Sequence, residues 1–113
     1  MSAQVEYDVL IVGAGSSGSV IAARLSENPN LHVALIEAGP DYADLADTPF
    51  DLINSHNNSY SDHDWGFEYH PTQQRLDRFP RGRVVGGSSA VNTAIALRGL
   101  PEDYDEWAQI TSD

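Results

Sequence analysis

Two apolar runs with a helical stretch between them organise the first forty positions of the chain. The first run, Val9–Val12, is rich in β-branched residues and has the length of a strand that is buried on both faces. The second run is His32–Ile36. In the stretch between them, Val20, Ile21 and Leu25 are spaced so that they can share one face of a helix. Strand, helix and strand in this order predict a parallel βαβ unit and an α/β fold.

The turn after the first run carries the pattern G-x-G-x-x-G, formed by Gly13, Gly15 and Gly18. These glycines permit a tight turn, a close approach of pyrophosphate to the backbone, and close packing of helix on strand. The N-terminus of the helix offers unpaired N–H groups and a partial positive charge to phosphates. Glu37, at the end of the second run, stands where a carboxylate accepts both hydroxyls of an adenosine ribose. Since it would repel a 2′-phosphate, the pattern predicts a site for FAD or NAD, not NADP.

The middle of the chain has weaker periodicity. Residues 47–49 supply a cap and a proline before Phe50–Ile53, which predicts a short helix. Aromatic and polar residues alternate over Asp64–His70, which predicts a strand that Pro71 closes. Residues 72–80 are polar, and we expect them to be exposed. Long segments with little regular structure are usually functional or pack against another part of the protein, so we expect more chain than is present here.

A second glycine-rich turn, Gly86–Ser89, follows two arginines. Small and apolar residues continue to Gly99, which predicts a helix over that stretch. Its start resembles the first turn in offering bare backbone to an anion or a planar ligand. The small side chains that leave room for a flat group are Ala90, Thr93 and Ala94. We expect the two turns to converge on a single extended nucleotide.

The last segment predicts a helix that begins at Pro101, because proline is favoured in the first helical turn and acidic residues follow it. The spacing of its apolar residues predicts one buried face. That face consists of Leu100, Tyr104, Trp107 and Ile110.

Composition narrows the function classes. The chain has 113 residues, enough for about one domain, and a net charge of −11 with an isoelectric point near 4.4. This acidity argues against a protein that coats nucleic acid or an anionic membrane surface. There is no cysteine, hence no disulfide and no thiolate site. With no signal-peptide pattern and no apolar run long enough to span a bilayer, we expect a cytoplasmic location.

Three stretches together resemble the glucose–methanol–choline (GMC) oxidoreductase family of FAD-dependent alcohol oxidases and dehydrogenases. They are YDVLIVGAGSSGSVIAARLSE with VALIEAG, then DWGFEYHP, then RGRVVGGSSAVNTAIALRGLPEDYDEWA. The last of them fits the family's first signature along its whole length. The resemblance is nearest to choline dehydrogenases and aryl- or furfuryl-alcohol oxidases, and it implies a Rossmann-like FAD-binding fold of which residues 1–113 are the N-terminal part.

The resemblance also implies which residues contact FAD. Those at the pyrophosphate are Gly13, Gly15, Ser16, Ser17 and Gly18, and those at the adenosine ribose are Glu37 and the backbone of Ala38. Those before and along the second turn are Arg83, Val85, Gly87, Ser88, Asn92, Thr93, Ala94 and Ile95. In some members a histidine just before the asparagine is bonded to the flavin. Because Val91 holds that position here, we expect non-covalent FAD.

Family members are several times longer than this chain. Their catalytic base, a histidine paired with a histidine or an asparagine, lies near the far C-terminus together with the substrate-binding sheet. None of the four histidines here matches it, namely His32, His56, His63 and His70. The resemblance thus implies an enzyme in which a distant histidine takes the hydroxyl proton of a small alcohol and hydride passes to the flavin. We expect no turnover from residues 1–113 alone.

Other readings remain open to different degrees. An NAD-dependent dehydrogenase shares the first turn and Glu37, and a truncated, non-catalytic nucleotide-binding module would share both turns. A P-loop lacks its lysine because Ser19 follows Gly18, and a serine-hydrolase elbow lacks its final glycine at Ala90. Residues 62–64 with His56 have metal-ligand types but no known metal spacing, so a solvated acidic loop is the better explanation. The particular alcohol, the electron acceptor and the oligomeric state are not determined by these residues.

Overall fold

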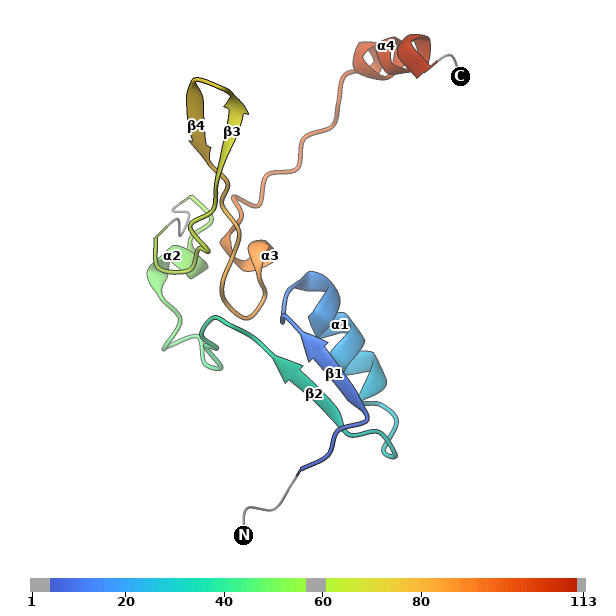
Figure 1. Ribbon diagram of the computed structural model, residues 1–113, viewed down its shortest axis with the longest axis vertical. Helices are drawn as coiled ribbons and strands as arrows, with labels where there is room; N and C mark the ends of the chain where they lie inside the picture. Colours follow the sequence, from blue (N-terminus) through green and yellow to red (C-terminus); the bar gives the residue numbers. More distant parts are fainter. Residues whose placement is uncertain (1–4, 57–60, 112–113) are drawn as a thin grey trace.

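The computed structural model describes residues 5–56 and 61–111. The helices and strands are β1 (Val9–Val12), α1 (Ser16–Leu25), β2 (Val33–Ile36), α2 (Phe50–Ile53), β3 (Glu68–Thr72), β4 (Arg75–Arg78), α3 (Ser88–Val91) and α4 (Pro101–Thr111). β1 and β2 pair in parallel, with Val9 opposite Val33 and Val12 opposite Ile36. Figure 1 shows α1 alongside this pair, which is the βαβ unit that the apolar pattern predicts. The α/β assignment and the short α2 helix are therefore confirmed.

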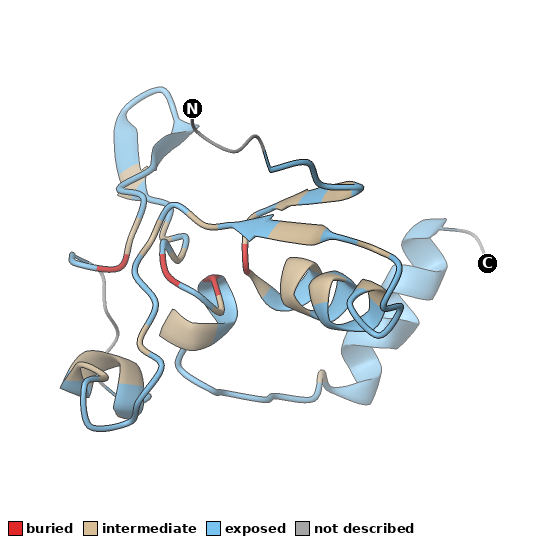
Figure 2. Ribbon diagram, turned by 90° about the horizontal axis from the view of Figure 1, so that it is seen from below, coloured by how far each residue is buried: buried red, intermediate tan, exposed pale blue. Residues whose placement is uncertain are grey.

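The β1–β2 sheet is covered on one face and open on the other. Ile11 lies next to α1, and its Cγ2 would be 3.4 Å from a Cβ at Gly18. Leu10 and Val12 point away from α1 and are 61% and 77% exposed. The expectation that this strand is buried on both faces is thus wrong for the described chain, in which α1 covers only one of them (Figure 2).

The best-buried residues lie at the junction of loops, not in the sheet. Ala14 and Val84 are each 1% exposed, and His63 is 3% exposed. They lie in three connecting segments, namely the turn after β1, the loop before β3 and the loop before α3. Figure 2 shows the buried positions in red within loops and turns. The protein's densest packing is therefore where distant turns meet, and both glycine-rich turns lie at this junction.

An antiparallel hairpin, β3–β4, extends from this junction. It corrects the predicted bounds of the strand. The strand begins at Glu68 rather than Asp64, and it runs through Pro71 instead of ending before it. Residues 72–80 are mostly exposed, as expected, but they contain the partner strand β4, which the sequence analysis did not predict. The register shifts between Tyr69 and Thr72, and such an irregularity is where a strand can accommodate a proline that lacks an N–H.

The helix predicted to run from the second glycine turn to Gly99 is wrong beyond Val91. Asn92 has ψ 166°, which is extended, and Ala94 has φ +52°. The Asn92 side chain explains the end of the helix, because its Oδ1 accepts a hydrogen bond of 2.7 Å from the backbone N–H of Ala94. A short polar side chain that bonds nearby backbone in this way competes with helical hydrogen bonds.

The final helix α4 begins at Pro101, as predicted, but it makes no extensive packing contact with another element of the described chain. The residues of its apolar face are 48% to 72% exposed, so the expected buried face is wrong within residues 5–56 and 61–111. Figure 1 shows α4 at the end of an extended segment, far from the βαβ unit. The radius of gyration of 19.4 Å reflects this, since a compact chain of 100 residues has about 13 Å.

Candidate cofactor-binding site

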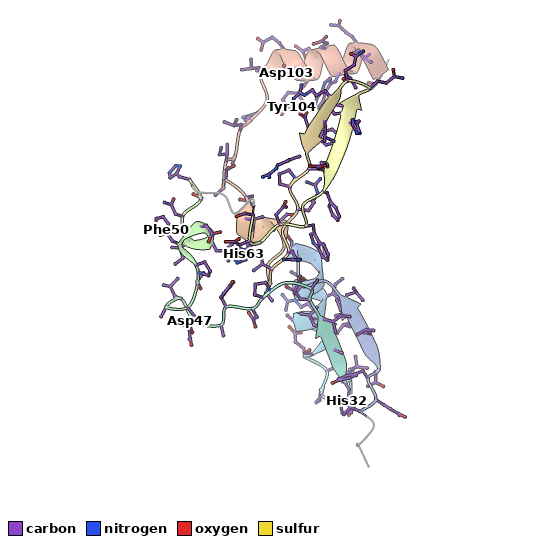
Figure 3. All side chains as sticks on the ribbon, turned by 60° about the vertical axis from the view of Figure 1, so that its left-hand side comes forward. His32, Asp47, Phe50, His63, Asp103 and Tyr104 are labelled. Carbon is purple, nitrogen blue, oxygen red and sulfur yellow. The ribbon has the colours of Figure 1, made fainter. Side chains whose placement is uncertain are left out.

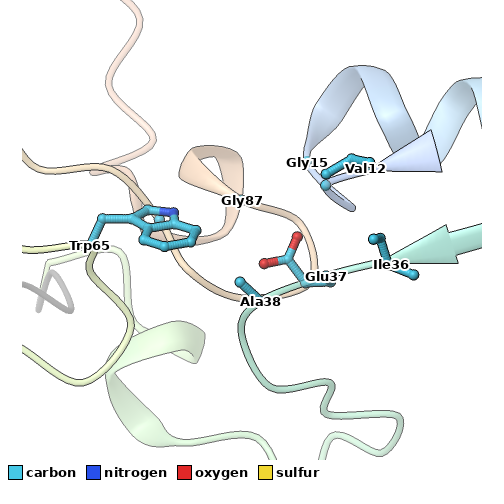
Figure 4. A pocket seen from close by; sticks show the side chains of 9 residues that line it. Val12, Gly15, Ile36, Glu37, Ala38, Trp65 and Gly87 are labelled. Carbon is cyan, nitrogen blue, oxygen red and sulfur yellow. The ribbon is translucent and has the colours of Figure 1, made fainter.

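The two glycine-rich turns lie against each other, as expected. Gly86 donates its N–H to the carbonyl of Ala14 at 2.7 Å, and Gly15 and Gly86 form a parallel bridge. A Cβ built on Gly87 would lie 2.9 Å from Cα of Gly15, too close for any side chain without a shift of backbone. The hydroxyls of Ser16 and Ser89 also contact each other across the two turns. Bare backbone from both turns therefore meets at one place, which Figure 4 shows from close by.

The first turn has the geometry that its glycines predict. Gly13 adopts φ +93° and donates its N–H to the carbonyl of Ile36 at 2.7 Å, which ties the turn to the end of β2. A Cβ on Gly18 would lie 2.0 Å from the carbonyl oxygen of Gly13, so only glycine lets α1 pack this closely. Gly15 is the N-cap of α1 and has no side chain to bond the first-turn N–H groups. These groups, which lack helical partners by geometry, are thus available to an anion.

Glu37 is held by the same turn. Its Oε2 accepts the N–H of Ala14 at 2.7 Å and its Oε1 accepts the N–H of Gly39 at 2.9 Å. Partial burial acts to raise the pKa of Glu37, but hydrogen bonds from the backbone of Gly39, Ala14 and Ala38 outweigh it and lower the pKa below the ordinary value. The carboxylate is therefore ionised at neutral pH, and its remaining lone pairs can accept hydroxyl groups.

A cavity of about 390 Å³ opens between the two turns and the end of β2. Its lining consists of Val12, Gly13, Gly15, Ile36, Glu37, Ala38, Trp65, Gly82 and Gly87. Most of the lining is apolar or bare backbone, with one carboxylate, and the volume falls within the range of small-molecule sites. Figure 4 shows the Glu37 carboxylate and the Trp65 indole on different sides of this space.

Four lining residues were not among the predicted cofactor contacts, namely Val12, Ile36, Trp65 and Gly82. Trp65 is the aromatic one, and its alternating pattern favoured simple packing over a place beside a ligand. Alternation placed it in a strand, whereas it precedes β3 and forms a wall of the cavity. Its N–H donates to the carbonyl of Arg81 at 3.0 Å, and Asp64 beside it accepts the N–H groups of Arg81 and Gly66 at 2.6 and 3.0 Å. The indole is stacked in parallel with the ring of Phe67, at 6.0 Å between centroids. The signal that could have found it is an aspartate–tryptophan–glycine turn, since the aspartate fixes the backbone on both sides of the indole.

The predicted cofactor contacts divide into three groups. Those that line the cavity are Gly13, Gly15, Glu37, Ala38 and Gly87. Those at the starts of α1 and α3 or in the backbone pairing around the cavity are Ser16, Ser17, Gly18, Arg83, Val85 and Ser88. Those on or just beyond the end of α3, outside the lining, are Asn92, Thr93, Ala94 and Ile95. The roles of all of them in binding stay predictions, and the last group would require a ligand that extends beyond this cavity.

The histidines and acidic residues do not form a metal site or a catalytic pair at the cavity. No group of three or more histidine, aspartate or glutamate side chains that could hold a metal ion occurs within residues 5–56 and 61–111. His63 bonds Tyr42 and Asp51, and His32 lies beside Asp8. Neither histidine is in the lining. No helix in the part of the chain that the structure describes is long and apolar enough to cross a membrane.

These residues fit a dinucleotide of the FAD type. Gly15 and Gly87 both line the cavity with bare backbone, the kind of surface that a pyrophosphate can approach closely. The ionised Glu37 faces the cavity with hydrogen-bond acceptors for ribose hydroxyls. The indole of Trp65 offers a flat apolar wall for a ring system.

Comparison with known proteins agrees with this fit. Residues 7–112 match the family model described as GMC oxidoreductase. The chain is 41% identical to the dehydrogenase pkfF of Emericella nidulans over 95% of its length and 42% identical to an alcohol dehydrogenase [acceptor] of Pseudomonas putida over 91%, and it covers 19% of each relative. The crystal structure of pyridoxine 4-oxidase from Mesorbium loti superimposes with a TM-score of 0.67 at 36% identity, over 92% of this chain and 21% of that one.

The chain thus spans about a fifth of the length of the curated relatives that it matches. The match begins at Tyr7, includes both glycine turns and extends into the C-terminal helix α4. This chain belongs to the GMC oxidoreductase family and corresponds to its N-terminal, FAD-binding region.

Proposed function

We propose that this chain supplies the FAD-binding part of an oxidoreductase that acts on the CH–OH group of a small alcohol. The observation that carries the proposal is the meeting of two glycine turns at a cavity that also contains an ionised carboxylate. The relatives support the substrate class, since one is named an alcohol dehydrogenase and another a pyridoxine oxidase. Their names differ in both substrate and electron acceptor, so the particular alcohol is not part of the proposal.

The residues of this chain have binding roles. The bare backbone at Gly15 and Gly87 approaches the pyrophosphate, and the first turn of α1 supplies N–H groups to it. Glu37 accepts the ribose hydroxyls and, by its charge, disfavours a 2′-phosphate. FAD, when bound, supplies the redox chemistry as the acceptor of hydride from the alcohol carbon. The base that takes the hydroxyl proton is proposed to lie outside residues 1–113.

We further propose that the FAD is held without a covalent bond. Val91, at the end of α3, occupies the position at which a covalent link would require a nucleophilic side chain, and valine has none. The binding energy must then come from the turns, from Glu37 and from the apolar walls of the cavity.

The experiment is a visible absorption spectrum of the purified full-length protein, followed by acid precipitation. We expect the absorption bands of an oxidised flavin, which bleach when alcohol is added without oxygen, and a yellow supernatant after precipitation. Flavin that stays in the pellet would contradict non-covalent binding. A full-length protein that takes up NAD but no FAD would overturn the proposed function in favour of a nicotinamide enzyme, which shares the first turn and Glu37.

A further inference from the structure

A buried histidine lies next to the cofactor site but outside its lining. His63 is 3% exposed, the lowest value for a polar side chain among the described residues. Its Nε2 lies 2.9 Å from the hydroxyl of Tyr42, and its Nδ1 lies 3.3 Å from Oδ2 of Asp51. The ring of Tyr42 also meets the imidazole edge to face, at 5.6 Å between centroids. We call Tyr42, Asp51 and His63 the histidine hub.

The hub joins three segments that are distant in sequence. Tyr42 follows β2, Asp51 belongs to α2, and His63 precedes the turn that leads to β3. Figure 3 shows His63 at the point where these segments meet the loop before α3. A neutral imidazole satisfies both partners, because Nδ1–H donates to the carboxylate while Nε2 accepts from the phenol. An apolar side chain would leave two part-buried polar groups without these bonds, which is costly.

The backbone of His63 connects the hub to the walls of the cavity. The carbonyl of His63 accepts the N–H of Arg83 at 2.8 Å, and two residues later the N–H of Trp65 donates to Arg81 at 3.0 Å. Residues 63–65 are therefore paired with residues 81–83. Since Trp65 lines the cavity, any shift of His63 also shifts this wall.

The paired segment continues directly into the second glycine turn. Val84, which is 1% exposed, anchors it, and a Cβ on Gly39 would lie only 2.1 Å from the carbonyl oxygen of Arg83. Four residues beyond Arg83, Gly87 contacts Gly15. Because the backbone is closely packed on both sides of Arg83, a displacement of Arg83 would be passed on to Gly87. The position of Gly87 therefore depends on where the histidine hub holds Arg83.

We propose that His63 is a positioning residue for FAD: through its bonds to Tyr42 and Asp51, it fixes the Trp65 wall and the Gly87 turn at the separation that the cofactor requires. The inference rests on the proposed function, because it concerns the same cavity. His63 touches neither the lining nor a reacting atom, so its effect is on cofactor affinity and orientation, and not on a proton transfer.

The test measures FAD dissociation constants of full-length apo-protein, with the variants His63→Leu, His63→Asn and Tyr42→Phe. We expect His63→Leu to weaken FAD binding about tenfold or more and Tyr42→Phe about three- to tenfold, in line with the loss of two buried hydrogen bonds and of one. His63→Asn keeps an N–H that can reach Asp51 and should recover part of the loss. His32→Leu is the matched control, because His32 also lies beside an aspartate, at 3.4 Å from Asp8, but is exposed and at the far end of the βαβ unit (Figure 3).

A second readout separates positioning from mere stability. Melting temperatures of the apo-proteins and visible circular dichroism of the bound flavin are recorded for each variant. We expect the flavin band to change in His63→Leu and to return toward wild type in His63→Asn. Wild-type dissociation constants and spectra in both His63→Leu and Tyr42→Phe, with only the melting temperature lowered, would overturn the inference.

The remaining outcomes are also decisive. If His63→Leu does not fold, Tyr42→Phe alone decides, since loss of a single hydroxyl leaves the packing intact. A wild-type protein that binds no FAD overturns the proposed function, and this inference with it. A wild-type protein that binds FAD as tightly as its hub variants do overturns this inference alone.

Discussion

Replacement of Gly87 by alanine tests the backbone approach on which the cofactor site depends. Gly87 has φ 57° and ψ −143°, and a residue with a side chain in such a conformation costs about 1–3 kcal/mol. The added Cβ would lie 2.9 Å from Cα of Gly15, whereas carbon atoms in contact prefer about 3.5 Å or more. The two turns must then move apart by about 0.6 Å, which would lengthen the hydrogen bonds that both are proposed to make to one pyrophosphate.

The expected result is a loss in both stability and affinity. We expect the free energy of unfolding of the full-length protein to fall by about 1–3 kcal/mol. The FAD dissociation constant should rise about tenfold or more, because one weakened hydrogen bond to a charged group is worth about 1.5–3 kcal/mol. The first quantity is measured by urea unfolding of apo-protein and the second by titration with FAD, followed by flavin fluorescence.

Gly66→Ala is the matched control for backbone strain. Gly66 also has positive φ, +69°, but a Cβ there would meet nothing within 4 Å. This variant should lose stability by about 1 kcal/mol while keeping its affinity for FAD. If Gly87→Ala binds FAD as tightly as Gly66→Ala does, close approach of the two turns is not what the second glycine provides, and the reasoning fails.

Three further predictions concern charge, the aromatic wall and the isolated chain. The lowered pKa of Glu37 means that its ionised form stabilises the fold fully above the ordinary carboxyl pKa, and that this contribution is lost as the pH falls through the lowered value. Because the same carboxylate is proposed to bind the ribose, the affinity for FAD should stay level from neutral pH into the mildly acidic range. A decline in affinity centred above the ordinary carboxyl pKa of about 4.3 would contradict this. Trp65→Ala should weaken FAD binding about tenfold and Trp65→Phe much less, because phenylalanine keeps a flat ring at this wall of the cavity. Equal losses of affinity in the two FAD titrations would show that the side chain at position 65 does not contact the cofactor. Residues 1–113 alone should melt without a cooperative transition in calorimetry, because a two-stranded sheet with Leu10 and Val12 exposed has too little buried apolar surface; a sharp melt without FAD would disprove it.

The features that local sequence determines were predictable. β1, α1 and β2 follow from an apolar period and a turn motif within one short stretch, and Gly18 has the close packing on Gly13 that its place in the motif predicts. The start of α4 at Pro101 follows from proline and acids in one turn. In each case the residues that decide the structure are neighbours in the chain, so pattern and propensity act on the same segment.

The features that depend on a competing or distant partner were not predictable. The end of α3 is decided by one Asn92 side chain that bonds the backbone of Ala94, against a run of small residues that favours helix. Alternation predicted a strand that includes Trp65, but Trp65 lies before β3, where its backbone N–H bonds the distant Arg81. The contact between Gly87 and Gly15 was expected because a single nucleotide would have to reach both turns. The contacts that hold the two turns in place, through His63 and Val84, are between distant residues and produce no recognisable sequence pattern.

The contact between Ser16 and Ser89 joins positions 73 residues apart, and the turns that carry them close the largest loop at the site. Bringing such distant segments together has an entropic cost that grows with loop length, and little buried apolar surface offsets it here. A ligand that bridges both turns binds the closed loop and not the open one, and so shifts the equilibrium toward closure as its concentration rises. By the same linkage, the proposed FAD would hold the two turns together, and with them the chain segments that lead into and out of each turn.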